Sequence, residues 1–299
     1  MLSSSPFHGL SAFPITPADK DGRVDTNILA QLLERLCEAK VDSIGLLGST
    51  GIYAYLTRNE RRRATEAAVE CVRGRVPLIV GVGALRTDEA QHLARDAEAA
   101  GADALLMAPV SYTPLTQDEA YKHYRAVTEA SDLPLCIYNN PGTTHFNFTL
   151  DLLVRLSYLP TIRAVKMPLP SDGVFASEIA TLRERTGLAI GYSGDWGMAD
   201  AMLAGADAFY SVLGGTIPGP VLAMVRAAQA GNADEVRTID AMLAPLWDTF
   251  KAFGSLRVMY LLVELIGIGI LAPPRPILPL EAKSREKVVA AIEPLLASG

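Results

Sequence analysis

The chain has 299 residues, of which 49% are hydrophobic, and a formal net charge of -6 at pH 7. That length allows one large α/β domain or two smaller ones, and the apolar content is ample for a sizeable core. The negative charge argues against nucleic acid as a partner, and the most apolar run, residues 258–273, contains Glu264 and is too short to span a bilayer.

The spacing of the cysteines and the composition of residues 1–6 predict a protein of a reducing, cytoplasmic compartment. Cys37, Cys71 and Cys136 show no CxxC spacing, so we expect free thiols, with neither disulfides nor structural zinc. Residues 1–6 lack a basic region and a long apolar segment, so a signal peptide is not expected. The triplet at 61–63, three arginines within a helical pattern, is interpreted as a solvated face.

Short apolar runs alternate with amphipathic patterns along the first 230 residues, which is typical of strands alternating with helices. Thr26 and Thr57 are the predicted N-caps of the first two helices. Strands are expected at 10–14, 43–48, 77–83, 104–109, 134–139, 162–168, 188–193 and 208–212. Helices are expected at 26–40, 58–73, 87–100, 116–130, 149–158, 172–186, 196–204 and from 218 onward.

Three helix-to-strand joints resemble one another, because small residues are followed by an aspartate just before an apolar strand, at Asp42, Asp103 and Asp207. Eight such units fit an α/β fold in which residues 1–230 form a closed (β/α)8 TIM barrel that carries the active site. An open doubly wound sheet is the runner-up, weakened because no GxGxxG follows the first strand. Residues 231–299 read as a C-terminal helical region of about three helices.

Lys166 lies in the middle of the apolar run Ile162–Pro168. A lysine is rarely buried without a partner or a purpose, and burial favours the neutral amine, which can attack a carbonyl carbon. The other lysines lie in polar loops or on mixed helical faces. The alternative interpretation is that Lys166 reaches solvent or a carboxylate from a strand end.

In a barrel, function belongs to the carboxyl ends of the strands and the loops after them. The residues found there are rich in hydroxyls: Ser49, Thr50, Ser111, Tyr112, Tyr138, Asn139, Ser193, Gly194, Asp195, Tyr210 and Ser211. The four histidines are scattered, so metal chemistry is disfavoured and no metal is expected. One lysine among hydroxyls suits Schiff-base chemistry, in which the iminium is an electron sink and a tyrosine relays protons.

Each of these groups has a second interpretation. Tyr138 can be a core aromatic, and Ser49 and Thr50 can belong to an ordinary turn. Asp195 can be a base or, as we favour, the cap of the following helix. The glycine pair at 214–215 can cradle a phosphate or make a tight exit into a helix.

The chain resembles the dihydrodipicolinate synthase / N-acetylneuraminate lyase family of class I pyruvate aldolases. The resemblance rests on the order and spacing of Gly48-Ser49-Thr50-Gly51, Tyr138-Asn139-Asn140-Pro141-Gly142, Ala164-Val165-Lys166, Ser193-Gly194-Asp195 and Ser211-Val212. It implies a barrel that is usually a homotetramer, without metal or organic cofactor. It also implies that Lys166 forms the Schiff base, Tyr138 relays protons, Ser49 and Thr50 hold the keto-acid carboxylate, and Tyr210 lines the pyruvate pocket.

Several positions depart from the synthase pattern. Val110-Ser111-Tyr112 replaces its Tyr-Tyr pair, so the relay tyrosine that a neighbouring subunit lends is missing at its usual place, although Tyr112 or Tyr210 could replace it. Thr143 stands where the synthase has an arginine for the aldehyde's carboxylate, and Ile52 replaces a common glutamate.

The leading functional hypothesis is therefore a Schiff-base lyase, an aldolase or dehydratase, acting on pyruvate or a related 2-keto acid. The alternatives are a 4-hydroxy-tetrahydrodipicolinate synthase that condenses pyruvate with aspartate semialdehyde, and a non-catalytic keto-acid-binding barrel. We expect small-molecule keto acid and aldehyde partners, no nucleic acid, no membrane, and a homotetramer or homodimer.

Overall fold

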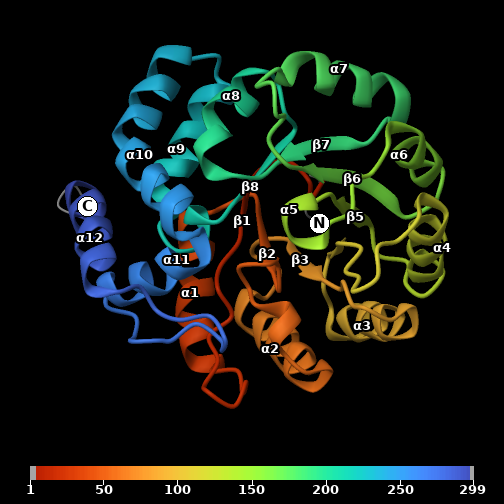
Figure 1. Cartoon of the computed structure of the whole chain (residues 1–299), viewed down its shortest axis with the longest axis horizontal. Helices are drawn as coiled ribbons and strands as arrows, with labels where there is room; N and C mark the ends of the chain where they lie inside the picture. The colour runs from red at the N-terminus through yellow and green to blue at the C-terminus, as the bar shows by residue number, and fades with distance from the viewer. Residues whose placement is uncertain (1–4, 297–299) are drawn as a thin grey trace.

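The apolar runs form the strands of one closed parallel barrel, with the helices around it (Figure 1). The computed structural model describes residues 5–296. Residues 1–4, part of the segment in which no signal peptide is expected, lie outside the described residues, as do residues 297–299 at the end of the predicted helical region. Within 5–296 the strands are β1 (Gly9–Ala12), β2 (Ser43–Leu46), β3 (Leu78–Gly81), β4 (Ala104–Met107), β5 (Leu135–Tyr138), β6 (Ile162–Met167), β7 (Ala189–Tyr192) and β8 (Ala208–Ser211).

Pairing between the first and last strands closes the sheet. β1 runs parallel to β8, with Gly9 opposite Ala208 and Ala12 opposite Ser211. Each remaining strand pairs with its neighbours in chain order, so the (β/α)8 prediction is confirmed and the open doubly wound sheet is wrong. The strands are buried on both faces because the barrel interior packs on one face and the helices pack on the other.

The predicted helices are present, with one short addition after β5 that the apolar pattern did not indicate. In chain order they are α1 (Thr26–Ala39), α2 (Arg58–Val72), α3 (Thr87–Ala100), α4 (Gln117–Thr128), α5 (Pro141–Thr144), α6 (Leu150–Ser157), α7 (Phe175–Thr186), α8 (Met198–Leu203), α9 (Pro218–Gln229), α10 (Ala233–Phe253), α11 (Ser255–Leu265) and α12 (Ala282–Leu296). Short 3-10 turns follow β2, β7 and β8 at η1 (Tyr53–Tyr55), η2 (Asp195–Gly197) and η3 (Leu213–Gly215).

The aspartates of the repeated joints fasten neighbouring strands together. Each precedes one strand and accepts a hydrogen bond from a backbone amide of the strand before it, at 2.7 to 2.8 Å. The pairs are Asp42 with Leu10, Asp103 with Leu78, and Asp207 with Ile190. Because an unpaired buried amide is costly, the motif satisfies donors at the amino ends of β1, β3 and β7.

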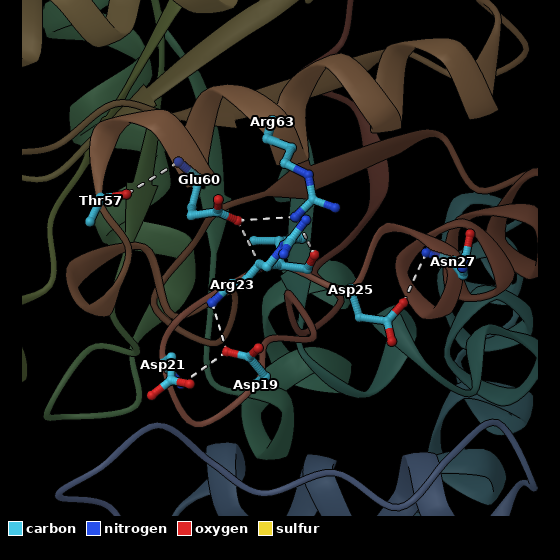
Figure 2. Close-up of polar contacts among 9 residues, drawn as sticks. Asp19, Asp21, Arg23, Asp25, Asn27, Thr57, Glu60 and Arg63 are labelled. Atoms are coloured by element: carbon cyan, nitrogen blue, oxygen red, sulfur yellow. Dashed lines mark hydrogen bonds and ion pairs between the residues drawn. The ribbon is translucent and has the colours of Figure 1, made fainter.

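The loop between β1 and α1 is tied to the first two turns of α2 (Figure 2). Glu60 accepts from the Val24 amide at 2.7 Å, and Arg63 donates to the Val24 carbonyl at 2.6 Å. Asp25, rather than the predicted Thr26, caps α1 by accepting two backbone amides of its first turn. Thr57 caps α2 as predicted.

Arg61 corrects the interpretation of the arginine triplet. Its side chain is buried and donates to the carbonyls of Gly81 and Gly83, at 2.8 and 3.0 Å, while its guanidinium lies over the Tyr53 ring. Burial lowers its pKa to about 10. The helical periodicity of the sequence did not show that the carbonyls at the end of β3 require a hydrogen-bond donor, which Arg61 supplies. Arg62 lies on the surface as predicted, where it pairs with Glu66.

The C-terminal helices pack on the side of the barrel formed by the last units (Figure 1). α10 contacts α8 and α9, and α11 and α12 pack against α10. None of the helices that the structure describes combines the length and the apolar character needed to cross a bilayer.

Candidate active site

A cavity of about 500 Å³ lies at the carboxyl ends of the strands. Its lining comes from the exits of β1, β2, β5, β6, β7 and β8, together with α10 and the start of α11. A cavity of about 640 Å³ between α1 and α2 is larger, but it lies in the helical shell, away from the strand ends. The catalytic end of a parallel barrel is the carboxyl end, so the smaller cavity is the candidate active site.

Lys166 lies at this cavity, 4% exposed, within a cage of aromatic rings. Its Nζ is 4.0 Å from the centroid of the Tyr138 ring, 4.2 Å from that of Phe13 and 5.5 Å from that of Tyr210. Register explains the first contact, because Lys166 on β6 is directly opposite Tyr138 on β5. The amine therefore faces a cavity instead of reaching bulk solvent.

The Tyr138 hydroxyl belongs to a hydrogen-bonded group at the cavity. Asn140 donates to it at 3.0 Å and also approaches the Ser49 hydroxyl at 3.5 Å. Asn140 therefore links the tyrosine on β5 to the loop after β2. The sequence motif contains Asn140, but its role as a bridge depends on the turn into α5, which the apolar pattern did not predict.

The loop that carries Ser49 and Thr50 has an unusual backbone. Leu47 and Ile52, on either side of it, have φ of 55° and 52°, a conformation that is rare for large side chains. Gly51 has no room for a side chain, since a Cβ there would lie 2.9 Å from the Leu47 backbone. Both Ser49 and Thr50 line the cavity, so the strained backbone holds two hydroxyls at its edge.

Asp195 fastens the loop after β7 to the turn after β8. Its carboxylate accepts from the backbone amides of Val212 and Leu213 at 3.0 to 3.2 Å, so the predicted cap of the following helix is wrong. Burial raises the pKa of this carboxyl to about 6. Gly215, in the same turn, packs against the Phe13 backbone, where a Cβ would lie 2.2 Å away.

The Asp195 carboxyl gives a pH dependence with a definite sign. Its pKa is raised from 3.8 to about 6 on folding, so its contribution to stability is fully present below about pH 4 and is lost as the pH rises through 6. The shift corresponds to roughly 3 kcal/mol. Urea unfolding of wild type and Asp195→Asn at pH 4 to 7 should therefore show a difference in unfolding free energy that changes across this range. A constant difference would contradict the raised pKa.

The other predicted site residues divide between the cavity and positions outside it. Thr143 and Gly194 are in the lining. Tyr210 lies beneath it, 1% exposed, with its hydroxyl 3.4 Å from the Cys136 thiol, and burial raises the pKa of Tyr210 well above its usual value. Ser111 and Tyr112 lie outside the lining, on the loop after β4, and the Tyr112 side chain is 96% exposed.

Several lining residues were not identified from the sequence. Phe13 comes from the exit of β1, Leu169 from the loop after β6 and Trp196 from η2, whereas Phe250 and Ser255 come from the C-terminal helices. The site therefore extends beyond residues 1–230, where the sequence placed it. Within residues 5–296, no arginine lines this cavity, and no group of three or more His, Cys, Asp or Glu side chains could hold a metal ion.

A family model and a sequence relative both match most of the chain. Residues 6–295 match the model of the Dihydrodipicolinate synthetase family. The chain is 35% identical over 253 residues to a 4-hydroxy-tetrahydrodipicolinate synthase of Pseudomonas putida, covering 84% of this chain and 86% of that protein.

Two crystal structures show the same likeness in three dimensions. A dihydrodipicolinate synthase from Agrobacterium tumefaciens superposes with a TM-score of 0.95 at 60% identity, covering 97% of this chain and 98% of that one. A dihydrodipicolinate synthetase of Pseudomonas aeruginosa, described as putative, gives a TM-score of 0.90 at 29% identity, covering 96% and 99%. The family match spans nearly the whole chain, and the chain therefore belongs to the dihydrodipicolinate synthetase family.

Proposed function

We propose that Lys166 forms a Schiff base with pyruvate or a related 2-keto acid. The observation that carries this proposal is the placement of the Lys166 amine at the cavity, beside the Tyr138 ring. Family membership gives the class of enzyme: the chain is a Schiff-base-forming carbon–carbon lyase, which leaves the non-catalytic barrel without support.

The residues of the cavity divide the reaction between them. The Lys166 amine attacks the keto carbon, and loss of water from the resulting carbinolamine gives the iminium. Tyr138, held by Asn140, donates and accepts the protons that these steps require. Ser49 and Thr50 offer hydroxyl groups to the keto-acid carboxylate.

The second reactant is proposed to lack a carboxylate that needs a charged partner. A small aldehyde acid normally requires an arginine, because bidentate charge-assisted hydrogen bonds are the strong ones. Thr143 stands at that position, and its hydroxyl lies 3.4 Å from the Asn140 carbonyl. The two arginines that could otherwise serve are placed elsewhere: Arg86 pairs with Asp88, and Arg163 donates to the Ile162 carbonyl.

Aspartate semialdehyde is therefore expected to be a poor partner for pyruvate. Loss of a charged contact should cost roughly 1.5–3 kcal/mol, or about 10- to 150-fold in kcat/KM, relative to uncharged aldehydes. The measurement is kcat/KM for aspartate semialdehyde and for a panel of neutral aldehydes, with pyruvate saturating. If aspartate semialdehyde is best by a wide margin, the chain acts as a 4-hydroxy-tetrahydrodipicolinate synthase, and the proposal of a second reactant without a carboxylate fails.

We also propose a homotetramer or homodimer in the cytoplasm. Leu85 and Tyr112, on the loops after β3 and β4, are 66% and 96% exposed, and a contact between subunits there would remove apolar surface from water. A contact there would also allow Tyr112 to reach a neighbour's cavity. Sedimentation velocity of the chain and of its Leu85→Asp variant tests this, and a monomer at all concentrations would contradict it.

A further inference from the structure

The cavity wall above the strand ends is apolar. Three large side chains form what we call the outer wall: Leu169 after β6, Trp196 in η2 and Phe250 in α10. They come from elements beyond the carboxyl ends of the strands, whereas Lys166 and Tyr138 come from the strands themselves. The wall therefore surrounds whatever extends out of the cavity from a keto acid bound at Lys166.

Packing fixes the outer wall in place. The Leu169 side chain lies on two glycines of the neighbouring loop: a Cβ at Gly197 would lie 2.5 Å from it, and one at Gly194 would lie 3.1 Å from it. The same Cβ at Gly194 would lie 3.6 Å from the Trp196 ring. Phe250 is 2% exposed, and its ring centroid is 5.8 Å from that of Trp247. Two glycines thus make room for a leucine beside an indole.

Two polar side chains of the cavity, Asp195 and Asn140, are already engaged near the strand ends. The Asp195 carboxylate accepts two backbone amides, and Asn140 bridges Tyr138 and Ser49. Within residues 5–296, Lys166 and Asp195 are the charged side chains that line the cavity. The outer wall itself carries no charged side chain. Trp196 is 42% exposed, and a ligand that covers this apolar surface gains favourable burial.

We propose that the carbonyl reactant of the lyase carries an uncharged, flat apolar group, as in an aromatic aldehyde, which packs against Trp196 and Leu169. This rests on the proposed function. The enamine carbon of the lysine-bound keto acid forms the new bond to the aldehyde carbon, and the aldehyde oxygen takes up a proton. Water then releases the product from Lys166, and the reverse sequence cleaves the same bond.

The test compares two uncharged aldehydes, benzaldehyde and glyceraldehyde, with saturating pyruvate. Benzaldehyde should have a kcat/KM about 10- to 100-fold higher, the selectivity that burial of an apolar group of this size provides. Trp196→Ala should lower kcat/KM for benzaldehyde by about 2- to 12-fold more than it lowers kcat/KM for glyceraldehyde, the effect of losing an aromatic pair. Trp196→Phe should retain most of the benzaldehyde activity.

Tyr158→Ala is the matched control, because Tyr158 is 82% exposed at the end of α6, outside the cavity. Tyr158→Ala should leave kcat/KM unchanged for both benzaldehyde and glyceraldehyde. Equal or better activity with glyceraldehyde, or an equal loss for both aldehydes in Trp196→Ala, overturns the inference. Borohydride trapping of pyruvate on the same preparations distinguishes failure of this inference from failure of the proposed function. Label on Lys166 without a preference for benzaldehyde refutes the apolar reactant alone. Absence of label refutes the proposed Schiff-base function as well.

Discussion

Lys166→Arg is expected to abolish the covalent adduct that wild type forms with pyruvate and borohydride. A guanidinium stays protonated and cannot form an imine, so retaining the positive charge does not rescue the chemistry. Mass spectrometry of the digested wild-type protein should show a reduced pyruvyl group on the peptide that contains Lys166. Turnover of the variant should fall to background.

Lys122→Arg is the matched control for this experiment. Lys122 is exposed on α4, where it pairs with Asp118 at 3.0 Å, and an arginine can keep that ion pair. It should label and turn over like wild type. An unlabelled Lys166 in the wild-type protein, or label on another lysine, would remove the basis of the mechanism.

Tyr138→Phe should preserve the fold and slow turnover by about 10²–10⁴-fold, the usual contribution of one general acid–base group. The ring keeps its contact with the Lys166 amine, and only the hydroxyl that Asn140 holds is lost. Trapping on Lys166 should persist after long incubation with pyruvate, because the variant slows proton transfer without removing the amine.

Steady-state kinetics and the melting temperature should be measured for Tyr138→Phe beside Tyr158→Phe, whose ring is exposed outside the cavity. If Tyr138→Phe and Tyr158→Phe turn over equally, Tyr138 is a core aromatic with a satisfied hydroxyl. A loss of activity that follows a large fall in melting temperature would point to the same conclusion.

The sequence predicts the barrel because its information is local and repeated. Each apolar run is long enough for one strand, and each amphipathic run covers one face of the sheet. The order of the units then leaves little freedom, since parallel neighbours must be joined by a crossover. The same logic places Lys166, Tyr138, Ser49 and Thr50 at one end of the barrel, where the structure brings them to one cavity. Thr143, which only the family resemblance indicated, lines the same cavity.

The remaining residues of the site depend on contacts between distant segments. Phe250 and Ser255 lie in a helical region whose own pattern shows only amphipathic helices, and docking brings them to the cavity. Tyr210 occupies an expected strand position, yet Phe13 from the opposite end of the chain packs edge-on against it, with ring centroids 5.9 Å apart. Gly45 is the sequence feature that could have indicated the position of the Phe13 ring, because a Cβ at residue 45 would lie 2.2 Å from that ring.

The pairing of β1 with β8 has a consequence for synthesis on the ribosome. Residues 9 and 208 are partners in the sheet, yet at ~5–20 residues per second they emerge about 10–40 s apart. During that interval β1 offers an unpaired backbone edge, a site where another nascent chain could add a strand. Chaperone dependence should therefore be greatest for truncated chains that end before β8, and it should decline once that strand has been made.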